Sequence, residues 1–152
     1  MIHQSLLAIR IERRRISLAA FSGLRLEFTS VHELTDDPFQ AATSTRKLIL
    51  WALDTLKPDA VALESTHHLS GLRRRNLWRL VQATVFTRRV RRMMIRTSSV
   101  RQAMGEPPLR NQRQVRDVAS TLWPRLPGTR HPSAYEAALL GLHTQMIALF
   151  MS

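Results

Sequence analysis

The chain has 152 residues, of which 44% are apolar, so it has the length of one ordinary domain and enough apolar side chains for one core. Its formal net charge is +12, and the lack of cysteine excludes disulfide bonds and thiolate metal sites. No run of about 18 apolar residues is present, and the opening "MIHQSLLAIRIERRR" becomes charged early. We therefore expect one domain over 1–152 that is soluble, cytoplasmic and without a membrane partner.

The first part of the chain predicts three strands. Residues 6–12, "LLAIRIE", form an apolar run that is typical of a strand buried on both faces. Residues 15–21 and 24–31 follow after turns at "ERRR" and "SG", which predicts a three-stranded antiparallel meander. In the third strand, alternation puts Leu24, Leu26 and Phe28 on one side, and Thr29 lies among the polar residues of the other.

A long amphipathic helix is predicted next, followed by a fourth strand. Asp37 suits the N-cap, Pro38 the first helical position, and Pro58 ends the segment. The apolar positions at helical spacing are Phe39, Ala42, Ile49, Leu53 and Leu56. Residues 59–64, "DAVALE", suit a central parallel strand whose last residue, Glu64, emerges at the carboxyl edge of the sheet, where sites form.

The rest of the chain predicts helices around one more strand. Residues 65–75 form a polar connection, 76–91 a second helix, 93–96 a fifth strand, and "SSVRQAMGEPPLRNQR" a short helical turn and a Pro-Pro loop. A third helix ends at Pro124, and the last helix has Ser133 as its expected cap. The inner face of the second helix is expected to hold Leu77, Leu80, Val81, Thr84 and Val85.

Positive charge is concentrated in one segment. Residues 73–116 hold 13 arginines and one acid, Glu106, whereas the other 108 residues have equal numbers of basic and acidic side chains. Of the 23 cationic residues 21 are arginine, whose planar fork pairs bidentately with phosphate. A nucleic-acid surface is predicted here, and the alternative is an ordinary solvated basic face.

Four segments resemble the RuvC-type Holliday junction resolvases. "LLAIRIERRRISLAAF" resembles the first hairpin of that family, "PDAVALE" its fourth strand, "SSVRQAMGEPPLRNQRQVRDV" its segment from the fifth strand into a helix, and "HPSAYEAALLGLH" its closing helix. The resemblance covers roughly residues 5–145. It implies an α/β, ribonuclease-H-like fold: a five-stranded mixed sheet, with an antiparallel meander plus parallel strands, flanked by helices.

The resemblance also points to a damaged nuclease site. Carried over residue by residue, the acidic tetrad of the family falls on Arg10, Glu64, Ser133 and Glu136, so only two of the four are acids. Two-metal phosphodiester hydrolysis needs carboxylates that bridge two Mg²⁺ or Mn²⁺ ions, and Arg10 puts a positive charge at that place. We expect Arg10 to pair with Glu64 and Glu136 as an internal substitute for the metal, with no cofactor.

An active site remains an alternative. Glu12 lies two residues beyond Arg10, on the same expected face, and is a candidate to replace the lost acid; the alternative is a solvated turn residue. His67, His68 and His131 fall near the same edge and are candidates for metal binding or proton transfer, against plain polar loop residues. An active enzyme would be a Mg²⁺- or Mn²⁺-dependent endonuclease with Glu64 and Glu136 as ligands.

Three functions follow from these observations. The first is a protein that binds branched or duplex DNA, the second is the active endonuclease, and the third is a scaffold subunit for a protein or RNA partner. The resemblance implies a homodimer through the second helix, where Trp78, Val85 and Phe86 are candidate contacts, although tryptophans on helices more often pack in a core. The arginines expected to bind DNA are Arg73, Arg74, Arg75, Arg79, Arg101, Arg110 and Arg113.

Overall fold

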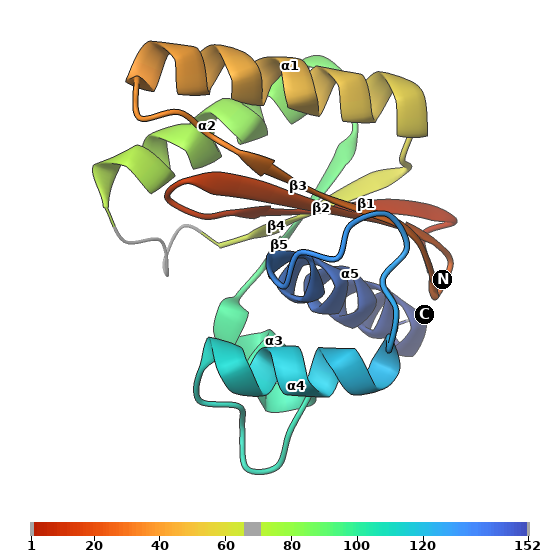
Figure 1. Cartoon of the computed structure of the whole chain (residues 1–152). Helices are drawn as coiled ribbons and strands as arrows, with labels where there is room; N and C mark the ends of the chain where they lie inside the picture. Colours follow the sequence, from red (N-terminus) through yellow and green to blue (C-terminus); the bar gives the residue numbers. More distant parts are fainter. Residues whose placement is uncertain (1, 66–70, 152) are drawn as a thin grey trace.

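The structure is a computed structural model that describes residues 2–65 and 71–151 (Figure 1). Its strands are β1 (Ser5–Ile11), β2 (Arg15–Ser22), β3 (Arg25–Glu33), β4 (Ala60–Glu64) and β5 (Arg91–Ile95). Its helices are α1 (Pro38–Leu56), α2 (Leu72–Thr87), α3 (Thr97–Ala103), α4 (Gln112–Leu122) and α5 (Ser133–Phe150). None of the helices in the described part of the chain is long and apolar enough to cross a membrane.

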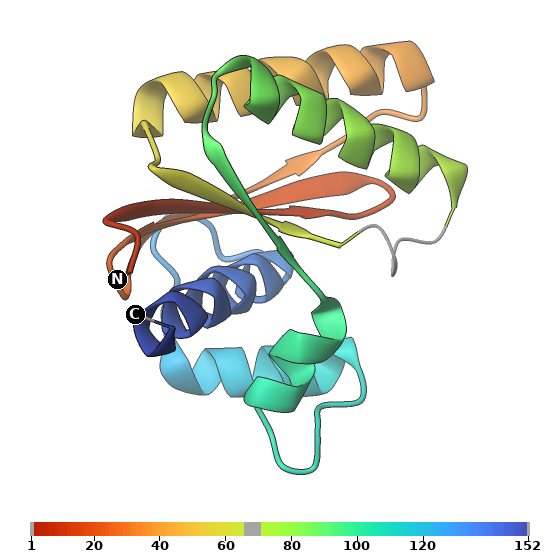
Figure 2. The same ribbon diagram turned by 180° about the vertical axis from the view of Figure 1, so that it is seen from behind.

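The five strands form one mixed sheet in the order β3-β2-β1-β4-β5. The pairs β1–β2 and β2–β3 are antiparallel, and β1–β4 and β4–β5 are parallel. Helices α1 and α2 cover one face, and α3, α4 and α5 lie on the other (Figures 1 and 2). The predicted fold class, a meander plus parallel strands flanked by helices, is confirmed.

β1 is the central strand, and its alternating side chains enter two cores. Leu7 and Ile9 pack with residues of α1 and α2, whereas Leu6 and Ala8 pack with residues of α5. α5 lies very close to the sheet, since a Cβ added at Gly141 would come within 2.3 Å of the Phe21 ring. The apolar run predicted as a strand buried on both faces is therefore buried as expected.

A bulge in β3 makes one part of the predicted alternation wrong. Ala20 pairs with Phe28 while Phe21 pairs with Leu26, so the register shifts between them and Glu27 is the extra residue. The shift puts Thr29 on the same face as Leu26, where Thr29 is buried and its hydroxyl donates to the Pro127 carbonyl at 2.6 Å.

Helix boundaries and faces differ from the prediction in several places. The Asp37 cap is confirmed, because its carboxylate accepts from the amides of Phe39 and Gln40, but Phe39 is exposed and Ala41 takes the buried position in that turn. α2 begins at Leu72 rather than at 76 and ends at Thr87, because the arginines of 73–75 are good helix formers that follow Gly71. β5 starts at Arg91, two residues earlier than predicted.

Candidate functional site

Arg10 connects two carboxylates at the carboxyl edge of the sheet. Its Nε lies 3.2 Å from Glu64 Oε1 at the end of β4, and its Nη1 donates to Glu136 Oε2 in the first turn of α5 at 3.1 Å. All three side chains are at least 90% buried. The predicted double ion pair is present, and it ties the two parallel strands to the helix that covers them.

Glu136 has further charged neighbours. Arg116 of α4 places its Nε 3.8 Å from the second carboxylate oxygen, Oε1. Burial raises the pKa of Glu136 above its ordinary value, and Glu12 adds to the rise, whereas Arg10 and Arg116 act in the opposite direction. The cost of burying the Glu136 carboxylate is therefore only partly offset by the two guanidinium groups.

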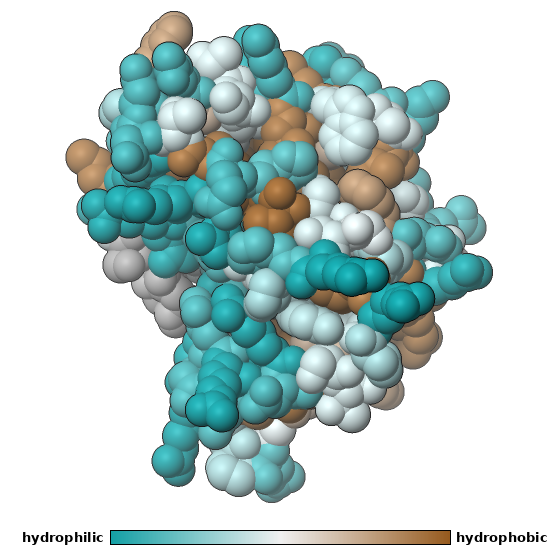
Figure 3. All heavy atoms as spheres, viewed as in Figure 1, coloured by the Kyte–Doolittle hydropathy of each residue, from teal (hydrophilic) through white to brown (hydrophobic). Residues whose placement is uncertain are grey.

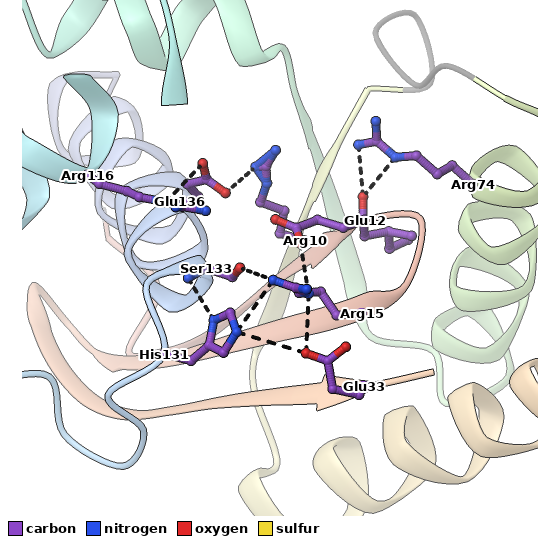
Figure 4. A network of polar contacts seen from close by, with 10 residues as sticks. Arg10, Glu12, Arg15, Glu33, Arg74, Arg116, His131, Ser133 and Glu136 are labelled. Atoms are coloured by element: carbon purple, nitrogen blue, oxygen red, sulfur yellow. Dashed lines mark hydrogen bonds and ion pairs between the residues drawn. The ribbon is translucent and has the colours of Figure 1, made fainter. Parts of the chain in front are cut away.

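Glu12 points into the same region but has its own cation. Its Oε2 lies 3.4 Å from Arg15 Nε, and Arg15 Nε is also 3.4 Å from Glu33 Oε1 (Figure 4). The face predicted for Glu12 is thus confirmed, since Glu12 neighbours Glu136. The Glu12 carboxylate itself is paired with Arg15, at the start of β2.

His131 and Ser133 join this network from the start of α5 (Figure 4). Arg15 Nη1 donates to Ser133 Oγ at 3.3 Å, and the Ser133 amide donates to His131 Nδ1 at 3.1 Å. Arg15 Nη1 also lies 3.4 Å from His131 Nε2, so the imidazole contacts both the Ser133 amide and Arg15. The cap prediction for Ser133 is wrong: Pro132 takes the N-cap position, and Ser133 is buried as the first helical residue, where its hydroxyl serves Arg15.

These residues do not fit a two-metal centre. Arg10, Arg15 and Arg116 lie against Glu12, Glu64 and Glu136, so guanidinium groups already take the place that an added cation would need. Within 2–65 and 71–151, no group of three or more histidine, aspartate or glutamate side chains is placed to hold a metal ion. His67 and His68, the other sequence candidates, lie outside the described residues.

A groove of about 700 Å³ opens beside this cluster, with Arg10 in its lining. Its walls come from the β1–β2 turn, the start of α2 and the start of α4, and Figure 3 shows hydrophilic side chains gathered on that side of the molecule. Two smaller hollows, of about 320 Å³ and 30 Å³, also include Arg10 and extend toward α3. The arginines of the large groove are Arg10, Arg13, Arg14, Arg15, Arg73, Arg74 and Arg116.

The structure separates the arginines that sequence singled out for DNA binding. Arg73 and Arg74 line the large groove, and Arg101 lines both smaller hollows. The other four are exposed and line none of these three hollows: Arg75, Arg79, Arg110 and Arg113.

Sequence reasoning missed Arg13, Arg14 and Arg116 in the groove. A signal for the first two existed: a turn that leaves the carboxyl end of β1 must lie at the same edge as the end of the parallel strand β4. Arg116 had no such signal, because its place depends on how α4 packs against α5.

The second helix offers less surface to a partner copy than its sequence indicates. Trp78 and Val85 are buried in the core, and the Trp78 indole donates to the Glu64 backbone carbonyl at 2.7 Å. Trp78 therefore positions the end of β4, as the packing interpretation of the tryptophans predicts. Phe86 is 66% exposed, with the Arg92 guanidinium 5.6 Å from its ring centre.

Comparisons with solved structures identify the fold. The RuvC of Thermus thermophilus matches at a TM-score of 0.77 and 15% identity, over 97% of this chain and 96% of that one. T. thermophilus RuvC in complex with a Holliday junction substrate matches at 0.78 and 16%, with the same coverage. The yeast mitochondrial Holliday junction resolvase Ydc2 matches at 0.67 and 12%, over 96% of this chain and 82% of that one. No family model and no curated protein matches the sequence.

Proposed function

We propose that this chain, which has the RuvC-like ribonuclease-H fold, is a cytoplasmic protein that binds branched or duplex DNA and has a crippled two-metal nuclease site. One observation carries the proposal: Arg10 lies within 3.2 Å of both Glu64 and Glu136, with its charge shared between them. A guanidinium that is already paired with the two remaining acids leaves no anionic cage for a dication.

Electrostatic energies also argue against a metal ion beside Arg10. Unit charges about 4 Å apart interact by roughly 4 kcal/mol at an effective dielectric near 20, so a dication beside Arg10 is repelled by about twice that amount. To bind between Glu64 and Glu136, a metal would also have to displace two ion pairs. Removing one partner of a buried pair costs about 3–5 kcal/mol.

Three observations support DNA as the ligand. The arginine-lined groove lies at the sheet edge beside Arg10, and the chain has an excess charge of +12 that attracts polyanions over a distance. The T. thermophilus RuvC with the same fold forms a complex with a Holliday junction substrate. Binding should therefore be strongly salt-dependent and need no divalent metal.

The test compares binding with cleavage on a labelled four-way junction. Wild-type protein should bind the junction in EDTA and leave it intact in Mg²⁺ or Mn²⁺. The double variant Arg10→Asp, Ser133→Asp restores the acid pattern and should gain metal-dependent cleavage, with a metal-dependent rise in Tm as a second readout. Wild-type cleavage that Glu64→Gln abolishes would overturn the proposal in favour of the endonuclease, and no DNA binding at low salt would favour the scaffold subunit.

A homodimer through α2 is part of the proposal. Of the three candidate contacts, Phe86 is the exposed one, since Trp78 and Val85 are buried in the core. Light scattering of the wild type beside Phe86→Ser tests it: a dimer that Phe86→Ser dissociates is expected, and a monomeric wild type would contradict it.

A further inference from the structure

The charges around the groove are distributed unevenly. Near the sheet, Arg10, Arg15 and Arg116 each lie within 3.8 Å of a glutamate, so that part of the site has little net charge. The remaining arginines of the lining form the outer wall: Arg13 and Arg14 in the β1–β2 turn, and Arg73 and Arg74 in the first turn of α2. We call these four residues the arginine wall. Its charge is about +4, and among the described residues of the groove lining Glu12 is the acid that faces it.

Two members of the arginine wall are held by neutral partners. Arg74 donates from Nε and Nη2 to the Ile11 carbonyl, at 3.2 and 2.9 Å. Arg73 donates to the carbonyls of Thr35 and Asp36. A carbonyl orients a guanidinium without neutralising it, so both side chains keep their full charge in a fixed position. Less side-chain entropy is then lost when an anion binds.

The other two members are exposed and weakly engaged. Arg14 Nε is 4.0 Å from Asp36 Oδ1, and the two side chains are 64% and 86% exposed. An ion pair this exposed to water contributes little to stability. Arg13 is exposed beside it. The start of α2 adds to the positive field, since Gly71 and Leu72 also line the groove and the first turn of the helix has no acid.

We propose that the arginine wall is the site that binds the phosphodiester backbone, by direct contact with guanidinium groups and without a metal ion. This inference rests on the proposed function and makes it specific, because it places DNA on Arg13, Arg14, Arg73 and Arg74 and not on the exposed arginines elsewhere on α2 and α4. Successive phosphates along a strand suit several cations that line one groove. Arg13 and Arg14 can each engage a phosphate through two N–H groups, and Arg73 and Arg74 add charge that is already fixed in position.

The experiment measures fluorescence anisotropy of a labelled four-way junction and a labelled duplex in EDTA, across a series of salt concentrations. The test variant is Arg13→Gln, Arg14→Gln. The matched control is Arg75→Gln, Arg79→Gln, which removes the same charge from exposed positions on α2 outside the groove. Circular dichroism melts check that both variants fold.

The test variant should bind at least tenfold more weakly than wild type at moderate salt. Its plot of log affinity against log salt should lose about two units of slope, because each lost phosphate contact removes about 0.9. The control should stay within about threefold of wild type, as expected for long-range screened charge. Arg74→Lys, which keeps the charge but loses the fork, should weaken binding severalfold without changing the slope.

Several outcomes would overturn the inference. If the control variant loses as much affinity as the test variant, the charge acts at a distance and the arginine wall is not the site. If an acidic polyglutamate peptide competes as well as unlabelled duplex of equal charge, the site takes carboxylate chains rather than phosphodiesters. Failure of wild type to bind any nucleic acid would instead remove the proposed function itself, so the two failures are distinguishable.

Discussion

Arg10 and Glu64 are neighbours across the parallel pair β1–β4, and their side chains meet at 3.2 Å where the paired strands end. The register that pairs Ile9 with Leu63 places both residues at the next position along their strands, on the same face of the sheet. Their approach is therefore fixed by the strand pairing, and α5 completes the ion pairs by bringing Glu136 over the same edge.

Removing the guanidinium should strongly destabilise the fold. Arg10→Met leaves two buried carboxylates without their shared cation, and the free energy of unfolding should fall by about 3–5 kcal/mol, measured by denaturant titration at neutral pH. The triple variant Arg10→Met, Glu64→Gln, Glu136→Gln removes all three charges and should recover most of the loss. A single variant that stays within about 1 kcal/mol of wild type would show that the ion pairs contribute little.

Glu136 should give the stability a specific pH dependence. Burial raises its pKa, so the folded chain binds this proton more tightly than the unfolded chain does. The contribution of Glu136 is then fully present below the ordinary carboxyl pKa, falls as pH rises through that value, and levels off above the raised pKa. Denaturant titrations of wild type and Glu136→Gln between about pH 4 and 8 should show wild type losing stability relative to the variant as pH rises. The opposite trend would mean that Arg10 and Arg116 outweigh burial.

His143 on α5 should also make stability depend on pH, with the opposite sign. It is buried, and its Nε2 has no hydrogen-bond partner among the residues that the structure describes. Burial lowers its pKa, so the protein loses stability as pH falls below about 6.5, until the lowered pKa is passed. His143→Leu should be more stable by about 1 kcal/mol at neutral pH, and its advantage should widen at pH 5.5. Thermal melts at both pH values measure this, and an equal difference at both would contradict it.

Gly128 should resist substitution more than any ordinary loop glycine. Its φ is +99°, and an added Cβ would lie 2.1 Å from the Thr29 carbonyl oxygen, so the loop before α5 would have to leave β3. Gly128→Ala should lower the free energy of unfolding by about 3 kcal/mol, since steric clash adds to about 1–2 kcal/mol of backbone strain.

Gly71→Ala is the matched control for this substitution. Gly71 also has a positive φ, of +84°, but an added Cβ would meet no atom within 4 Å among the described residues. Its φ of 84° with a ψ of 145° is a conformation that almost only glycine adopts, so its cost should be backbone strain alone, of about 1–3 kcal/mol. Equal losses in the two variants, measured by denaturant titration, would argue against the clash at Gly128.

Sequence reasoning predicted the order of elements, the fold class and the pairing of Arg10 with Glu64 and Glu136. The order of elements depends on patterns that survive folding, namely apolar runs and an Asp-Pro helix start. The fold class and the pairing of Arg10 with both acids were implied by the resemblance to the RuvC-type resolvases. The burial of Thr29 could not be predicted, because the bulge at Glu27 reverses the alternation without a sequence mark of its own. The start of α2 was missed because a run of arginines suits a helix as well as a polar connection.

The site was predicted less completely than the fold. Arg116 lies 20 residues before Glu136, and only the packing of α4 against α5 brings the two side chains together. Arg15 is three residues from Glu12, and the β1–β2 turn brings that pair together. Trp78 was named as a candidate dimer contact, and the structure follows the other interpretation, packing in the core, with the indole donating to the Glu64 carbonyl. Charge density along the chain located a basic segment but not the groove.

The two hydrogen bonds from Arg74 to the Ile11 carbonyl connect the groove lining directly to the backbone of β1. Ile11 ends the central strand, whose residues from Leu6 onward are buried. An anion held by Arg74 is thereby connected to a strand of the core. Its binding should be felt as slower amide hydrogen exchange along β1, including the residues near Leu6 at the end of the strand away from the groove.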